Sequence, residues 1–288
     1  MTQAIHGLVD IADRYDAVLC DVWGVIHNGR ESFAPACDAL IRFQQTRGSV
    51  VLISNAPRPA AAVHAQLDQL GVPREAWSGF VSSGDATRSV LAAIAPGPVF
   101  ALGPDRDEPL YDGLGLTFAP LEDAAYIACT GLVDDMTETP EDYRVRLMDA
   151  ARRGLPFVCA NPDRVVQRGD RLIPCAGALA DLYEELGGEV IMVGKPYAPT
   201  YVLAVAEAER LAGRQLDRAR ILCIGDGVGT DVKGAEAQGL DCLFVTGGIH
   251  VGEGDAADIL AAAGTRAAFS LAALAWDGDN RTTAGGDQ

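Results

Sequence analysis

Short apolar runs that alternate with segments of helical periodicity constrain the fold of this chain more than any other feature. Each run has four or five residues and suits a buried strand, and the runs lie at 17–20, 49–53, 99–102, 125–129, 155–159, 190–193, 221–224 and 242–245. Intervening segments such as 34–48 and 198–213 carry proline near the start and glycine at the end, which is typical of helices. This alternation predicts an α/β protein with a mostly parallel sheet.

Four of these runs end in polar or ionisable residues. The residues that follow them are Asp21, Ser54 with Asn55, Gly194 with Lys195, and Gly225 with Asp226. Ligands of open parallel sheets bind outside the carboxyl ends of the strands, so we expect four strands to bring these groups to one edge. The stretch 84–180 has few such endings. We therefore predict a discontinuous core domain, 1–83 plus 181–288, with an inserted domain at 84–180.

Composition and charge exclude several classes of protein. The 288 residues are 49% hydrophobic and 22% charged, which suits one or two globular domains. A net charge of -17 without a run of lysine or arginine argues against a nucleic-acid partner. Neither a secretory leader nor an apolar stretch of membrane-spanning length is evident, and the seven cysteines form no CxxC pair. We expect a cytoplasmic protein with reduced thiols and no membrane partner.

Asp21 ends the first apolar run, within the sequence AVLCDVWG. A carboxylate at this position costs too much free energy to bury unpaired, so we expect it to face solvent, a cation or a metal ion. Capping of the turn toward the next helix is an alternative role for Asp21.

The sequence ILCIGDGVGTD at 221–231 places a second and a third carboxylate near a strand end. Asp226 follows the strand directly, and Asp231 falls in the expected first turn of the next helix. Two carboxylates at a strand-to-helix turn suit magnesium, which takes carboxylate oxygens together with substrate phosphate. Thr230 or Asp231 could instead serve as a helix cap.

The remaining two strand ends carry a hydroxyl group and an amine. Ser54, with neighbouring backbone N–H groups, could hold a phosphoryl oxygen. Lys195 follows Gly194 and precedes Pro196, where its charge would neutralise a phosphoryl group or Asp21. Taken together, these groups predict a phosphoryl-transfer site in which an aspartate attacks phosphorus and charge is stabilised electrostatically.

At this point the chain resembles the haloacid dehalogenase (HAD) superfamily of hydrolases, and within it the class IIA, NagD-like branch. The four motifs of the superfamily appear in order as CDVWG, ISN, GKP and GDGVGTD, and CANPD at 159–163 is similar to a signature of that branch's cap domain. The resemblance implies a Rossmann-like, HAD-like core interrupted by an α/β cap domain that closes over the site and selects the substrate.

The resemblance also implies a role for each matching residue. Asp21 corresponds to the nucleophile, and Lys195 to the catalytic lysine. Ser54 and Asn55 correspond to substrate or phosphate ligands, and Asp226 and Asp231 to metal ligands. Asn161 and Asp163 correspond to substrate ligands on the side of the cap. Asp21 would also bind Mg²⁺, and the backbone carbonyl of residue 23 would complete the protein ligands.

One position departs from the family pattern. Phosphatases of this family carry an acid-base aspartate two residues after the nucleophile, and this chain has Trp23 there. Trp23 keeps the backbone carbonyl, so metal binding is retained, but indole exchanges no proton near neutral pH. Loss of a positioned acid-base group typically costs ~10²–10⁴-fold in rate. His27 or a cap residue could replace that group, and His27 could equally be an ordinary turn histidine.

The sequence therefore predicts a magnesium-dependent phosphatase of small phosphorylated metabolites that acts through an aspartyl-phosphate intermediate. A non-catalytic or regulatory protein that binds a phosphorylated metabolite is an alternative. A metal-independent dehalogenase is a third possibility, against which the retained Asp226 and Asp231 argue. Dimerisation of two identical chains is compatible with the sequence.

Overall fold

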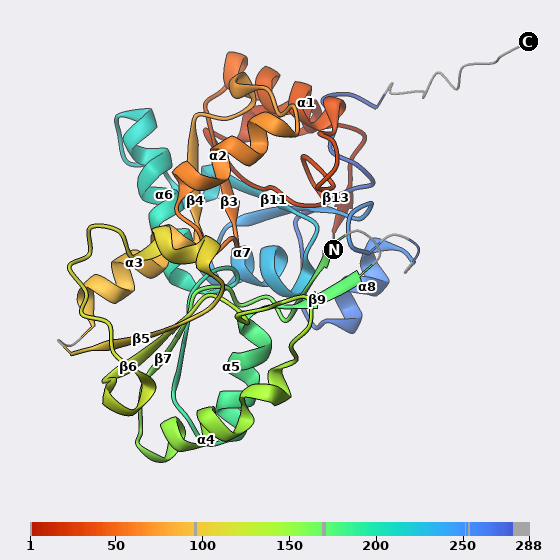
Figure 1. Cartoon of the computed structure of the whole chain (residues 1–288). Coiled ribbons are helices and arrows are strands. Elements are labelled where there is room, and N and C mark those ends of the chain that lie inside the picture. Colours follow the sequence, from red (N-terminus) through yellow and green to blue (C-terminus); the bar gives the residue numbers. More distant parts are fainter. Residues whose placement is uncertain (1, 95–96, 169–170, 251, 253, 279–288) are drawn as a thin grey trace, which may run out of the picture. The chain divides into compact units, whose positions relative to one another are not determined.

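The computed structural model describes residues 2–94, 97–168, 171–250, 252 and 254–278 (Figure 1). The chain divides into two compact units. Unit 1 comprises Met1–Leu52, Leu67–Gly79 and Val205–Gln288, and unit 2 comprises Ile53–Gln66 and Phe80–Ala204. These limits differ from the domain limits expected from the sequence, and the insertion at 84–180 stays a prediction.

A seven-stranded sheet has the order β1-β13-β12-β11-β2-β3-β4. The strands are β1 (Gln3–Ala4), β2 (Ala17–Asp21), β3 (Ser49–Ser54), β4 (Gly79–Ser82), β11 (Ile221–Gly225), β12 (Asp241–Val245) and β13 (Phe269–Leu271). The pairings from β1 through β2 in this order are all parallel. The α/β fold with a parallel sheet that the sequence predicts is thereby confirmed.

Helices connect these strands. Their bounds are α1 (Ala34–Thr46), α2 (Ala60–Gln69), α6 (Ala198–Ala212), α7 (Lys233–Gln238) and α8 (Ala256–Ala262), and α2 and α6 cross the limits between the units. Short 3-10 helices lie at Leu8–Asp10, Ala12–Arg14, Arg74–Ala76 and Arg218–Arg220, and a π-helix, η8, spans Val228–Val232. None of the helices within the described ranges combines the length and apolar character that crossing a lipid bilayer requires.

Unit 2 contains a four-stranded sheet of order β10-β7-β6-β5, with every pairing parallel. Its strands are β5 (Val99–Leu102), β6 (Tyr126–Cys129), β7 (Phe157–Cys159) and β10 (Val190–Met192), and its helices are α3 (Ser83–Ala93), α4 (Arg144–Arg152) and α5 (Ala176–Glu185). Further 3-10 helices lie at Asp105–Tyr111, Leu121–Asp123 and Pro140–Tyr143.

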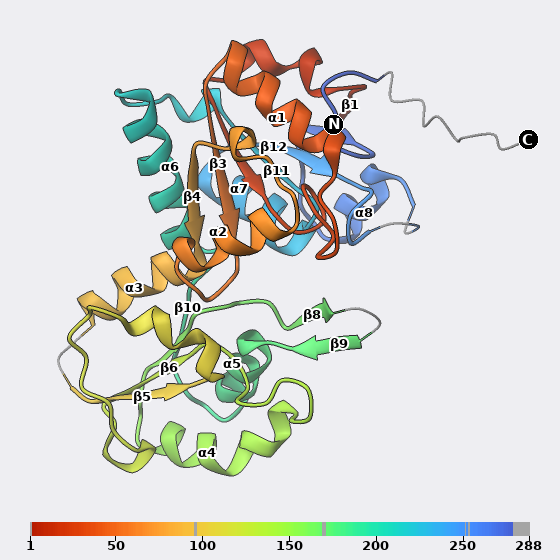
Figure 2. The same ribbon diagram turned by 45° about the horizontal axis from the view of Figure 1, so that its top comes forward.

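Strand β6 shows how this sheet is built. Ile127 and Cys129 pack into one apolar cluster with residues of α4 and α5, whereas Tyr126 and Ala128 pack into a second cluster with residues of α3. Successive side chains of a strand point to opposite faces, so an uninterrupted apolar run predicts burial on both sides. Figures 1 and 2 show α3 and α4 on opposite sides of this sheet, as that pattern requires.

The sequence predicted the strands themselves correctly, but it assigned one of them to the wrong sheet. Each of the eight expected runs contains a strand, but β10 pairs with β7 rather than joining the strands that end at Asp21 and Asp226. An apolar run indicates a buried strand without specifying its neighbour. The runs missed were β1, β4 and β13, which have two to four residues, and the antiparallel hairpin of β8 (Val165–Arg168) and β9 (Arg171–Pro174).

Candidate active site

The carboxyl ends of β2 and β11 meet where the order of the sheet reverses. From β2 the chain proceeds outward through β3 and β4, whereas from β11 it proceeds in the other direction through β12 and β13. Such a reversal leaves a crevice outside the carboxyl ends of the two central strands, where doubly wound proteins bind ligands. Asp21 ends β2, and Asp226 directly follows β11.

Three carboxylates gather at this reversal. Asp21, Asp226 and Asp231 are all buried and each offers an oxygen that lies within 4.8 Å of the others. The parallel register explains part of this proximity, because Cys20 of β2 is paired with Ile224 of β11. The structure thus brings together the three side chains that the sequence indicates as metal ligands.

Backbone packing holds Asp226 in place. Its Oδ2 accepts a hydrogen bond from the Ile249 N–H at 2.9 Å. A Cβ atom at Gly24 would lie 2.0 Å from the same oxygen, and one at Gly248 would lie 1.9 Å from it. Gly24 also has a φ of 77°, a conformation that glycine adopts without strain. Neither glycine is predicted as a site residue from the sequence, although the Gly-Gly pair after the strand at 241–245 indicates a close backbone approach.

Asp231 lies in a π-helical turn and not in the first turn of a regular α-helix. The Val232 N–H donates to the Gly227 carbonyl five residues earlier, at 3.1 Å. Oδ2 of Asp231 accepts the Gly227 N–H at 3.0 Å, and a Cβ atom at Gly225 would lie 2.2 Å from its Cγ. Single π turns within helices are frequent at functional sites.

The loop after β2 folds on itself around Trp23 and His27. Their rings meet edge-on, with centroids 4.8 Å apart, and the Gly24 N–H donates to the His27 carbonyl at 2.9 Å. The buried His27 ring accepts the Gly29 N–H at Nδ1, at 3.0 Å, and burial lowers the pKa of His27 to about 4. Trp23, in contrast, is 39% exposed.

The other expected site residues lie in unit 2, where the side chain of Asn55 is hydrogen-bonded to both Lys195 and Asp163. Its side-chain Oδ1 accepts the Lys195 N–H at 2.7 Å, and its Nδ2 donates to the Asp163 carboxylate at 2.8 Å. Nδ2 also lies 3.3 Å from the Lys195 carbonyl. Asn161 accepts the Asp163 N–H at 3.0 Å, and Ser54 Oγ accepts the Ala56 N–H at 3.2 Å.

Close packing also fixes the loop that carries Lys195 against the loop that carries Asp163. Gly194, immediately before Lys195, has a φ of 114°, and a Cβ atom there would lie 2.5 Å from Pro162 Cδ. Lys195 as a whole residue is 3% exposed. The Asn55 side chain therefore contacts the loops that carry Lys195 and Asp163, a positioning role that the strand-end pattern alone does not indicate.

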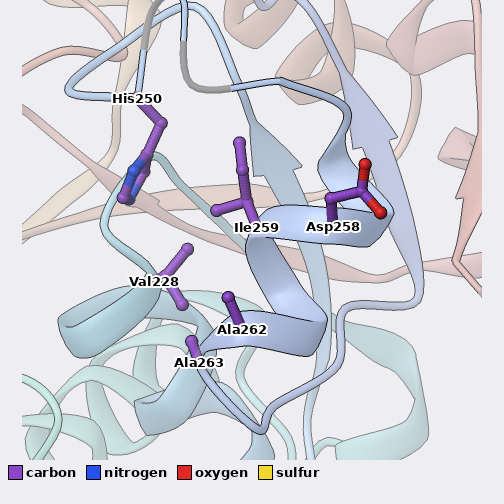
Figure 3. Close-up of a pocket in the computed structure, with 6 residues that line it drawn as sticks. All are labelled: Val228, His250, Asp258, Ile259, Ala262 and Ala263. Atoms are coloured by element: carbon purple, nitrogen blue, oxygen red, sulfur yellow. The ribbon is translucent and has the colours of Figure 1, made fainter.

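A pocket of about 490 Å³ opens in unit 1 beside the π-helix and α8 (Figure 3). Its lining residues are Val228, His250, Asp258, Ile259, Ala262 and Ala263. The lining is mostly apolar, and the three clustered carboxylates are not part of it. The groups suited to catalysis therefore lie at the strand ends and not in this pocket.

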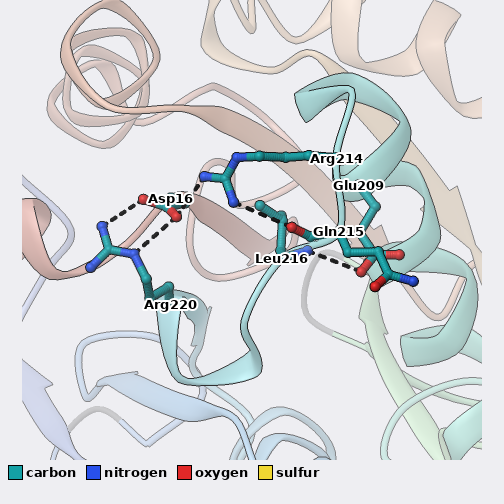
Figure 4. Close-up of polar contacts among 6 residues, drawn as sticks. All are labelled: Asp16, Glu209, Arg214, Gln215, Leu216 and Arg220. Carbon is teal, nitrogen blue, oxygen red and sulfur yellow. Dashed lines mark hydrogen bonds and ion pairs between the residues drawn. The ribbon is translucent and has the colours of Figure 1, made fainter.

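Ion pairs join the opposite, amino ends of β2 and β11 (Figure 4). Asp16, directly before β2, accepts two hydrogen bonds from Arg220, at 2.6 and 2.9 Å, and a third from Arg214 at 2.8 Å. The Arg220 and then the Arg214 hydrogen bonds hold the pKa of Asp16 well below its usual range. These contacts tie together the starts of the two strands whose ends carry Asp21 and Asp226.

Comparison with known proteins identifies the family. A model described as haloacid dehalogenase-like hydrolase matches residues 18–117, and one described as HAD-hydrolase-like matches residues 192–274. A solved hydrolase of the haloacid dehalogenase-like family from Brucella suis 1330 is 47% identical, with a TM-score of 0.86, and the match covers 94% of this chain and 99% of that one. The chain belongs to the haloacid dehalogenase-like hydrolase family, as its motifs predict.

Two further relatives have names that specify an activity. The 5'-nucleotidase YutF of Bacillus subtilis is 26% identical over 82% of this chain and 88% of its own length. A glycerol phosphate phosphatase from Mycobacterium tuberculosis, solved in complex with calcium, is 28% identical with a TM-score of 0.65. That match covers 83% of this chain and 68% of the solved chain.

Proposed function

We propose that this protein is a magnesium-dependent phosphatase of small phosphorylated metabolites, with Asp21 as the nucleophile. The observation that carries the proposal is the cluster of three buried carboxylates, within 4.8 Å of one another, at the reversal of the sheet order. The names of the two relatives, a nucleotidase and a glycerol phosphate phosphatase, support phosphate esters as the substrate class.

The residues of the cluster fit a hard divalent cation. Three buried carboxylates repel one another and have lost most of their hydration, so a cation among them lowers the free energy of the arrangement. Their oxygens are the donors that magnesium prefers. Asp21, Asp226 and Asp231, with the backbone carbonyl of Trp23, would hold the ion. When bound, it would supply positive charge beside the phosphoryl oxygens.

In the proposed reaction a carboxylate oxygen of Asp21 attacks phosphorus. The ester P–O bond breaks, and the leaving group departs with the bonding electron pair. Water then attacks the phosphorus of the aspartyl phosphate and the P–O bond to Asp21 breaks. Inorganic phosphate leaves with the protons of that water, and the free carboxylate of Asp21 is regenerated. Ser54 would hold a phosphoryl oxygen, and Lys195 would supply positive charge to the transferring group.

On the substrate side we propose Asn55, Asn161 and Asp163 as ligands or as groups that position ligands. The hydrogen bonds of Asn55 to Lys195 and Asp163 support the positioning role. The cap domain at 84–180, residence in the cytoplasm and a homodimer belong to the same proposal and are open to direct measurement.

Turnover of 4-nitrophenyl phosphate, with and without added Mg²⁺, tests the proposal. We expect magnesium-dependent release of 4-nitrophenol by the wild type and a loss of at least ~10³-fold in Asp21→Asn. Asp38→Asn, a change in an exposed acid of α1, serves as the control. Saturable binding of the ester without turnover would support the non-catalytic alternative, and halide release without metal would support a dehalogenase.

A further inference from the structure

The exposed indole of Trp23 contrasts with the buried apolar side chains that follow β2. Val22, Val25 and Ile26 are at most 2% exposed, whereas Trp23 is 39% exposed. Two residues span at most about 7 Å, so the backbone of Trp23 lies close to that of Asp21. The next residue, Gly24, packs directly against the Asp226 carboxylate. The indole therefore starts from the backbone segment that contacts the carboxylate cluster.

The loop holds this indole in a defined position. The His27 ring meets it edge-on, at an interplanar angle of 72°. The Gly29 N–H donates to Nδ1 of that ring, and the Gly24 N–H donates to the backbone carbonyl of His27. Gly29, with a φ of 80°, lies so close that a Cβ atom there would be 2.3 Å from Cη2 of Trp23. An aromatic side chain fixed in this way loses little conformational entropy when a ligand stacks on it.

Packing in the core does not account for Trp23. A core residue would be buried, as its apolar neighbours in the loop are. Nor does indole donate a proton to a leaving group, because its N–H does not titrate in water near neutral pH. A rigid, partly exposed aromatic ring on the residue two positions after the nucleophile is suited to contact with a flat apolar group of the substrate.

We propose that Trp23 stacks on an aromatic leaving group and that the preferred substrates are aryl phosphates, the phosphate esters of phenol-type hydroxyl groups. This inference rests on the proposed function of Asp21. When the P–O bond to the aryl oxygen breaks, the oxygen keeps the electron pair and departs as a phenolate. A phenol has a pKa of about 10, so the phenolate leaves without a proton from the enzyme, whereas the alkoxide of an alkyl ester is far more basic.

Two esters of equal charge separate stacking from phosphate recognition. The test measures turnover of phenyl phosphate and ethyl phosphate by the wild type, Trp23→Leu, Trp23→Phe and Trp276→Leu, with kcat and KM determined separately. Trp276 provides a matched change, because it is a second partly exposed indole of unit 1, and its carbonyl accepts the Val9 N–H at 2.9 Å.

For phenyl phosphate we expect Trp23→Leu to raise KM about three- to tenfold, with Trp23→Phe close to the wild type, because an aromatic pair contributes this much beyond buried area. KM for ethyl phosphate and all values for Trp276→Leu should be unchanged. Equal effects of Trp23→Leu on both esters, or no effect on phenyl phosphate, would overturn the inference.

Calorimetric binding to Asp21→Asn keeps the inference separate from the proposed function. If the wild type turned over neither ester, the proposed function would fail, and binding would still decide the role of Trp23. Weaker binding of phenyl phosphate alone after the additional change Trp23→Leu would sustain stacking. Unchanged binding, or equal weakening for phenyl and ethyl phosphate, would contradict it.

Discussion

The two units gather their polar groups in different ways. In unit 1, Asp21, Asp226 and Asp231 come together because two neighbouring parallel strands end at the reversal of the sheet, and glycine backbone packs against the carboxylates. In unit 2, one side-chain amide, that of Asn55, connects the loops that carry Lys195 and Asp163. Topology thus concentrates like charge in one unit, while in the other a neutral side chain connects the backbone of Lys195 to the Asp163 carboxylate.

The difference teaches which changes each group should tolerate. A cluster placed by strand ends and glycine packing should be sensitive to loss of charge and to any added side-chain volume. A cluster placed by one amide should be sensitive to the pattern of donors and acceptors, because a buried group that loses its partner costs about 1–3 kcal/mol.

Removing one charge from the unit 1 cluster should have the largest effect. Asp226→Asn keeps the shape of the side chain but weakens attraction for a cation, so phosphatase turnover should fall about 10²–10³-fold. Calorimetric titration with Mg²⁺ should show a parallel loss of affinity. Asp258→Asn alters an exposed acid of α8 in the same unit and should leave both measurements unchanged. An Asp226→Asn protein with wild-type Mg²⁺ affinity would contradict the assignment.

Added volume is the next test, and the chain offers a matched pair of glycines. Gly24 and Gly239 both have positive φ, 77° and 68°, but only the Cβ position of Gly24 lies against Asp226, and that of Gly239 meets no atom within 4 Å. Each change to alanine should lower stability by roughly 1 kcal/mol through backbone strain. Gly24→Ala should in addition reduce turnover about 10²-fold, because it displaces a carboxylate.

Chemical denaturation and steady-state turnover of the two variants check this comparison. If Gly24→Ala and Gly239→Ala lost activity to the same extent, backbone strain rather than the Asp226 contact would be responsible.

Replacing the Asn55 amide by a carboxylate tests the hydrogen bonds that connect Lys195 and Asp163 in unit 2. Asn55→Asp places a like charge where Nδ2 now donates to Asp163 at 2.8 Å, and we expect about a tenfold loss of kcat with a smaller change in KM. Combining it with Asp163→Asn exchanges donor and acceptor and should recover part of the loss. A double variant whose loss equals the sum of the two single losses would show that Asp163 acts independently of Asn55.

The ion pairs at the amino ends of the strands should have the smallest effect. Since the Arg220 hydrogen bonds lower the pKa of Asp16 in the folded protein, its stabilisation is present above the pKa of the unfolded chain, about 3.9, and is lost as pH falls below it. Asp16→Asn should cost about 1 kcal/mol at pH 7, and the difference should shrink below pH 4.

Urea denaturation of the wild type and Asp16→Asn, at pH 7 and below pH 4, measures the difference in their free energies of unfolding. Asp38→Asn, which removes an exposed pair with Arg42 within α1, should cost only about 0.3 kcal/mol at pH 7. A pH-independent cost of Asp16→Asn would point to packing instead of charge.

The sequence predicted the carboxylate cluster of unit 1 better than the contacts of Asn55 in unit 2. The eight apolar runs predicted strands, and polar residues after two of them predicted the carboxylates that meet at the reversal. Periodicity contains no information about which sheet a short run joins, so β10 was misplaced. Long-range packing on Asp226 by Gly24 and Gly248 depends on backbone paths that no local pattern specifies.

Asn55 illustrates a second limit. Its position after a strand predicts a polar group near a ligand, but its partners lie more than 100 residues away in sequence. The contrast between buried His27 and exposed Trp23 was likewise invisible, because both follow the same strand within six residues of Asp21.

The π turn of η8 has a consequence for how such a chain can vary. In this turn the Gly227 carbonyl accepts the Asp231 N–H at 2.8 Å and also the Val232 N–H, five residues on, at 3.1 Å. Since each residue advances a helix by about 100°, deleting a single residue between Gly227 and Asp231 would rotate every later side chain by that angle. A change of length in this turn would therefore remove Asp231 from the three-carboxylate centre as completely as its substitution would.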